Sequence, residues 1–122
     1  MRMRCEQKLL HQRDRAAVAA CRAFGLEHPE HPGARTLAFA AGRVAEDDVG
    51  DLEAAEEAYS RALLLSPFVG VTGTDALLAR ARVREARGDT DNARADLRLY
   101  LHNEPAARDD VAVAALAERL GL

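Results

Sequence analysis

The stretch GDLEAAEEAYSRALLLSP, residues 50–67, decides the fold class of this chain. It begins with a Gly-Asp pair, continues with alanines at helical spacing and stops at Pro67. Glycine suits the left-handed end of one helix, and aspartate caps the unpaired N–H groups of the next. Proline cannot continue a helix. The stretch therefore predicts a helix that follows another one through a tight turn.

The same pattern recurs along the chain at a shift of 38 residues. The coinciding sets are Pro29, Pro67 and Pro105; Ala17, Ala55 and Ala93; and Gly50-Asp51 with Gly88-Asp89. A further helical run precedes each Gly-Asp pair. Self-similarity at such a period is typical of repeat architectures, so each unit is interpreted as a pair of helices.

These residues resemble the tetratricopeptide repeat. The matching positions in the best copy are Gly50, Ala55, Tyr59, Ala62 and Pro67, which correspond to the turn, the small alanine, the aromatic, the second alanine and the closing proline. The following copy keeps the glycine, the first alanine and the proline. The resemblance implies a short α-solenoid whose concave groove is lined by the first helix of each pair.

We expect one all-α domain over residues 1–122, with about three antiparallel helix pairs and a C-terminal capping helix. The expected repeat units are 1–31, 32–69 and 70–106, followed by the capping segment 107–122. The expected helices are 2–12, 13–28, 33–48, 51–66, 74–87, 89–104 and 107–120. The composition agrees, because aromatic residues make up only 4% of the chain and isoleucine is missing.

The resemblance also implies which residues face the groove. If Gly42 is the family's small residue, one extra residue precedes Gly50, and the first helices match at a shift of 39, with Arg43 over Arg82. A strict shift of 38 would place Arg43 over Ala81 instead. On the first register, the groove residues are Thr36, Phe39, Ala40, Arg43 and Glu46 in one unit and Asp75, Leu78, Ala79, Arg82 and Glu85 in the next.

Arginine side chains are the best candidates for binding. Arg43 and Arg82 together would bind a peptide carboxylate through charge-assisted hydrogen bonds. The alternative is local pairing on their own helices, Arg43 with Asp47 and Arg82 with Glu85. A second stripe, formed by Arg80, Arg84 and Arg87, lacks the neighbouring aromatic residues that stack on bases, so nucleic-acid binding is disfavoured.

Signatures of catalysis, cofactors and metals are missing from the sequence. His28 and His31 are separated by a proline, so they do not share one rigid helix face. Cys21 is interpreted as a buried apolar residue, and a disulfide with Cys5 is not expected. A phosphate-binding loop is not found. We therefore expect no enzymatic activity, no cofactor and no metal site.

Charge and hydropathy indicate which classes of partner the protein is suited to bind. The net charge is −3, which favours neither nucleic acid nor an anionic membrane, and no apolar run reaches the length of a membrane span. The arginine- and alanine-rich composition is typical of bacteria, and we expect a cytoplasmic protein. The leading interpretation is a protein-interaction module that binds a peptide or protein partner. The alternatives are homodimerisation through Val113, Leu116 and Leu120, and a regulatory accessory domain of a larger bacterial protein.

Overall fold

The structure is a computed structural model that describes residues 2–65 and 71–122, with side chains from 5–65 and 74–122. The α-helices are α1 (Arg2–His11), α2 (Arg15–Glu27), α3 (Ala34–Val44), α4 (Leu52–Leu64), α5 (Val71–Ala86), α6 (Thr90–Asn103) and α7 (Val111–Arg119). A π-helix η1 (Ala45–Val49) extends α3, and a 3₁₀ helix η2 (Pro105–Asp109) precedes α7. The described residues contain no strand, which confirms the all-helical class.

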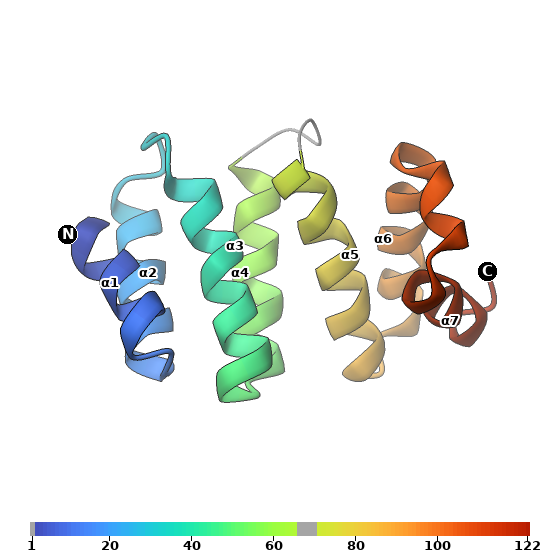
Figure 1. Cartoon of the computed structure of the whole chain (residues 1–122), viewed down its shortest axis with the longest axis horizontal. Helices are drawn as coiled ribbons and strands as arrows, with labels where there is room; N and C mark the ends of the chain where they lie inside the picture. Colours follow the sequence, from blue (N-terminus) through green and yellow to red (C-terminus); the bar gives the residue numbers. More distant parts are fainter. Residues whose placement is uncertain (1, 66–70) are drawn as a thin grey trace.

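The helices stand side by side in chain order (Figure 1). Each of the helices α1 to α5 packs against the next one in the chain, and α1 also contacts α3, which in turn contacts α5. The short turns at 12–14, 50–51 and 87–89 lie along the lower edge of the row in this view, and the connection 28–33 lies at the upper edge (Figure 1). Successive helices therefore alternate in direction, with the odd-numbered helices α1, α3 and α5 in contact along one side.

The Gly-Asp turns have the predicted backbone, but their aspartates differ. Gly50 and Gly88 have φ of 76° and 83°, the left-handed conformation that favours glycine. Asp51 accepts a hydrogen bond from the Ala54 N–H at 3.1 Å, which confirms its capping role. The expected cap at Asp89 is wrong. Its carboxylate instead accepts from the side-chain amide of Asn92 at 2.9 Å, so it caps no backbone group.

One extra residue precedes the first Gly-Asp turn. The N–H of Asp51 donates to the carbonyl of Ala45, six residues back, whereas the N–H of Asp89 donates to the carbonyl of Arg84, five residues back. The surplus residue is taken up by η1, because a π-helix has a wider turn than an α-helix. The first helices of these two units therefore correspond at a shift of 39, and the second helices at 38.

Small side chains form the contacts between helices. Ala55, Ala58 and Ala62 of α4 are fully buried, as expected. Gly42 lies against the ring of Tyr59, and a Cβ atom at Gly42 would lie 2.5 Å from a ring carbon. At the corresponding positions of the next unit, Ala81 and Leu97 share one buried cluster. One unit thus pairs a glycine with a large aromatic ring, and the next unit pairs an alanine with a smaller leucine at the corresponding positions.

The boundaries of α5 and of the C-terminal helix differ from the prediction. The helix after Pro67 was expected to begin at residue 74, but α5 begins at Val71. A single helix was expected over 107–120, but α7 begins at Val111, and Asp110 caps it by accepting from the N–H groups of Ala112 and Val113. The 3₁₀ helix η2 occupies the residues between α6 and α7. Pro105 stands at its start, a position that proline favours in helices.

Three large apolar residues of the C-terminal segment are buried within the chain, whereas Val111 at the start of α7 is exposed. Val113, Leu116 and Leu120 are 4%, 3% and 0% exposed, and they pack in one cluster with Leu97 and Leu101 of α6. The expectation that these residues leave an apolar surface for a second copy is therefore wrong. An amphipathic pattern does not indicate which neighbour covers the apolar face.

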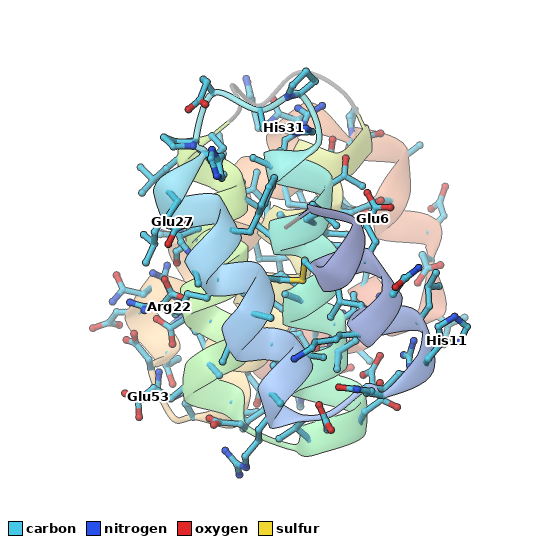
Figure 2. All side chains as sticks on the ribbon, turned by 90° about the vertical axis from the view of Figure 1, so that its left-hand side faces the viewer. Glu6, His11, Arg22, Glu27, His31 and Glu53 are labelled. Carbon is cyan, nitrogen blue, oxygen red and sulfur yellow. A yellow bond between two sulfur atoms is a disulfide. The ribbon has the colours of Figure 1, made fainter. Side chains whose placement is uncertain are left out.

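A disulfide joins Cys5 of α1 to Cys21 of α2, so the expectation of unpaired thiols is wrong. Figure 2 shows this bond between the two helices at the N-terminal end. The Cα atoms are 5.1 Å apart and both residues are buried. The geometry of a disulfide depends on the distance between two helices, which the sequence does not give.

In the described part of the chain, no helix has the length and apolar character needed to cross a membrane.

Candidate functional site

The residues expected to face one groove are divided between two hollows. One hollow of about 380 Å³ lies between α1 and α3, and Thr36 and Ala40 are part of its lining. The other hollow, of about 440 Å³, lies between α5 and α7, and Leu78 and Arg82 are part of its lining. Figure 2 shows that Glu6, which also lines the first hollow, lies on the opposite side of this end from α2's Arg22. Both hollows are thus formed by odd-numbered helices.

The hollow between α5 and α7 has an apolar floor and a polar rim. Its lining residues are Leu78, Arg82, Tyr100, Ala107, Asp110, Ala112, Val113, Ala115, Leu116 and Arg119. The alternation of buried and exposed positions on α7 places Ala112 and Ala115 at the surface of the hollow and Val113 and Leu116 beneath them. Open hollows of this size that combine apolar surface with a few polar groups are typical of ligand sites.

Arg82 is held by a carboxylate of the preceding unit. Its guanidinium donates to both oxygens of Glu46 at 2.7 and 2.8 Å, and the Tyr59 hydroxyl donates to the same carboxylate at 2.8 Å. Burial alone would raise the pKa of Glu46, but hydrogen bonds from Arg82 and Tyr59, together with the charges of Arg82 and Arg43, lower it below the usual value. The Glu46 carboxylate therefore joins α3–η1, α4 and α5.

Arg43 pairs locally, whereas Arg82 does not. Arg43 lies 3.2 Å from Asp47 on its own helix, and its side chain is half exposed, which confirms the local alternative for this residue. For Arg82 the local alternative is wrong, because its partner is Glu46. Glu85 instead contacts Arg119 of α7 at 3.4 Å. Both arginines lie near the Glu46 carboxylate, whose pKa responds to both charges.

The other expected groove residues have separate environments. The Phe39 ring is partly buried against Tyr59, with 5.7 Å between the ring centroids. Ala79 is 2% exposed, so the expectation that it faces a groove is wrong. Asp75 is exposed, and its charge contributes to a raised pKa of Tyr100 after the larger effect of burial. Asp75 thus lies close to the hollow between α5 and α7.

The second arginine stripe belongs to an internal ion-pair network that sequence reasoning missed. Asp96 of α6, which is 4% exposed, accepts from Arg80 at 2.8 and 2.9 Å and from Arg84 at 2.9 Å. Arg84 and Arg87 also pair with Glu56 of α4. These arginines are occupied in joining α4, α5 and α6. An acidic residue at a buried helical position, as at Asp96, is the signal that points to such a network.

The two histidines pack against an aromatic ring. The rings of His28 and His31 lie 5.1 and 5.3 Å from that of Phe24. The Nδ1 atom of His31 accepts a hydrogen bond from the Gly33 N–H at 2.9 Å, which shapes the turn before α3. Within residues 2–65 and 71–122, no group of three metal-binding side chains gathers. These histidines therefore stabilise a turn.

Comparisons of the chain with protein families, curated proteins and solved structures find no match. Function is therefore inferred from the geometry of the hollows and from the internal repetition of the chain.

Proposed function

We propose that this chain is a non-catalytic protein-interaction module, a short α-solenoid of TPR-like helix pairs, that binds a peptide segment of a partner between α5 and α7. Three features support the arrangement. The helices pack in chain order, the Gly-Asp turns repeat, and α1, α3 and α5 contact one another along one side. Stacks of this kind have concave surfaces that serve for binding.

The hollow between α5 and α7 is the observation that carries the proposal. It combines a volume of about 440 Å³ with the side chains of Leu78, Tyr100 and Leu116 and with arginines on its rim. Leu78 and Arg82 are two of the residues that the resemblance places in the groove. Apolar anchors surrounded by polar side chains are the usual arrangement of a peptide-binding surface.

Arg43 and Arg82 have a different role in this proposal from the one expected. Arg82 already donates to both oxygens of Glu46, so a partner carboxylate would have to displace an internal one. That exchange leaves Glu46 partly buried without its hydrogen bonds, which is unfavourable. We therefore assign Arg82 to the contact between units and Arg43 to a local ion pair, and we assign partner binding to Leu78 and the surface of α7.

The disulfide is relevant to the cellular compartment in which the protein acts. Disulfides persist mainly in oxidising compartments, and the Cys5–Cys21 bond therefore favours such an environment over the cytoplasm. Trapping thiols with an alkylating reagent in cells that produce the full protein tests this point. A protein whose two cysteines are both alkylated when it is denatured in the reagent without reductant would contradict it.

Selection of peptides from a random displayed library tests the function. We expect enriched peptides that bind the purified protein and lose at least tenfold in affinity on Ala115→Phe, because the added ring fills the hollow. The matched control is Ala114→Phe, which adds the same ring to an exposed neighbouring position outside the hollow. A lack of enrichment, or binding that Ala115→Phe leaves unchanged, would contradict the proposal. A role as a regulatory accessory domain uses the same surface and is tested in the same way.

A further inference from the structure

The hollow between α5 and α7 has the same order of side chains on both of its walls. Along α5, the exposed Asp75 is followed by Leu78 and Arg82, which are partly exposed and line the hollow. Along α7, the sequence runs from Asp110 through Leu116 to Arg119. Each wall thus begins with a carboxylate, continues with an apolar side chain and ends with a guanidinium. Asp75 and Arg82 are seven residues apart, which is about 10 Å along a helix axis.

The two carboxylates lie at one end of the hollow. Tyr100, which is part of the lining, has a raised pKa, first because of its burial and then because of the charges of Glu104, Asp75 and Asp110. Asp110 of α7 lines the hollow together with Tyr100, and the charge of Asp75 also acts on Tyr100, so this end of the hollow is acidic.

The guanidinium groups lie at the other end. Arg119 contacts Glu85, which follows Arg82 by less than one turn of α5. This contact is a single one at 3.4 Å, and the Arg119 side chain is 53% exposed. Arg82, in contrast, donates two short hydrogen bonds to Glu46. Arg119 is therefore the cation of this end that is able to turn towards a partner, and Arg82 adds positive charge behind it.

We infer that the hollow binds a helical segment with a basic side chain, an apolar anchor and an acidic side chain, in that order along one face and over two helical turns. The inference rests on the proposed function and specifies its partner. The basic group lies by Asp75 and Asp110, the anchor enters the hollow above Leu78 and Leu116, and the acidic group lies by Arg119. A helix places residues i, i+3, i+4 and i+7 on one face, which matches the spacing of the α5 wall.

The order of charges distinguishes this partner from others. A segment with acidic groups at both ends places one of them beside Asp75 and Asp110, and a segment with basic groups at both ends places one of them beside Arg82 and Arg119. Like charges at such a rim are unfavourable and suppress the wrong partner. We expect the mixed segment to bind about tenfold more tightly than either, because each of these loses one favourable contact and gains one repulsion.

The test uses three capped, alanine-rich helical peptides with leucine at i+3 and i+4. They carry Lys and Glu, Glu and Glu, or Lys and Lys at i and i+7, and their affinities are measured by fluorescence anisotropy. We expect Arg119→Gln to weaken binding of the mixed and the all-acidic peptide about threefold and to spare the all-basic one. Asp110→Asn has the opposite pattern, and it keeps the helix cap because asparagine caps as well as aspartate. Arg98→Gln, at an exposed position of α6 outside the hollow, serves as the control.

The outcomes separate this inference from the proposed function. Tightest binding of the mixed peptide, with the two opposite variant patterns, supports the inference. Equal affinities for all three peptides, abolished by Ala115→Phe, overturn the charge order but leave a peptide-binding groove. Failure of all three peptides, while library-selected peptides bind, overturns the helical pattern alone. Failure of both sets overturns the inference together with the proposed function.

Discussion

Gly42→Ala offers a quantitative test of how the repeat units correspond. Within a helix, this substitution normally increases stability by about 1 kcal/mol. Here the new Cβ atom would lie 2.5 and 2.6 Å from two ring carbons of Tyr59. The ring has little room to move, because it is fully buried and its hydroxyl donates to Glu46. Overpacking of this kind costs up to about 3 kcal/mol, so we expect a net loss of about 2 kcal/mol.

The second unit supplies the compensating change. Ala81 and Leu97 occupy the positions that correspond to Gly42 and Tyr59, at shifts of 39 and 38. In a Tyr59→Leu background, Gly42→Ala should therefore increase stability by about 1 kcal/mol, its ordinary helix contribution. The coupling between the two substitutions is then about 3 kcal/mol. Urea unfolding followed by far-ultraviolet circular dichroism measures all four proteins. Equal effects of Gly42→Ala in both backgrounds would refute the contact and the correspondence.

Four further variants probe the ion pairs, the disulfide and the alanine contacts. Asp96→Asn leaves buried arginines without their carboxylate and should cost about 3 kcal/mol in urea unfolding; a loss below 1 kcal/mol would make the network dispensable. Because the pKa of Glu46 is lowered in the folded protein, its ionised carboxylate stabilises the fold fully above the pKa of an unfolded glutamate. This contribution to the free energy of unfolding is lost as the pH falls towards the folded-state pKa. The stabilities of wild type and Glu46→Gln should therefore converge on acidification. Reduction should lower stability by about 3 kcal/mol in wild type but not in a Cys5→Ala, Cys21→Ala double variant, as thermal melting with and without reductant will show. Ala55→Leu should overpack and cost about 1–3 kcal/mol, and an unchanged melting temperature would argue against its contact.

Local chemistry explains which parts of the fold were predictable. Gly50, Asp51 and Gly88 have turn conformations that follow from the preferences of single residues, so the sequence predicts the helix turns and the all-helical class. The extra residue before Gly50 was predictable from the repeat, but its π-helical form depends on a backbone hydrogen bond from Gly50 to Ala45. Turns that depend on neighbouring residues are thus predictable from the sequence, whereas their exact backbone geometry is not.

Contacts between distant residues explain what was missed. Arg82 and Glu46 are 36 residues apart, and their pairing depends on how two units lie against each other. The same holds for the disulfide, because Cys5 and Cys21 lie on two helices whose separation is set by packing. Alanine at position 79 has no side chain long enough to reveal its direction from the pattern. The candidate hollow depends on where α7 lies relative to α5, and the sequence alone does not predict the position of the capping helix.

The binding site in the hollow between α5 and α7 is the central claim, and a nuclear magnetic resonance titration tests it most directly. The isotope-labelled protein is titrated with a library-selected peptide, and the shift of each backbone amide is followed. We expect the largest changes to gather at Leu78, Tyr100, Ala112, Ala115, Leu116 and Arg119, with small changes at Arg22, Glu53 and Glu57 of α2 and α4. Changes concentrated on α2 and α4, or in the hollow between α1 and α3, would contradict the claim.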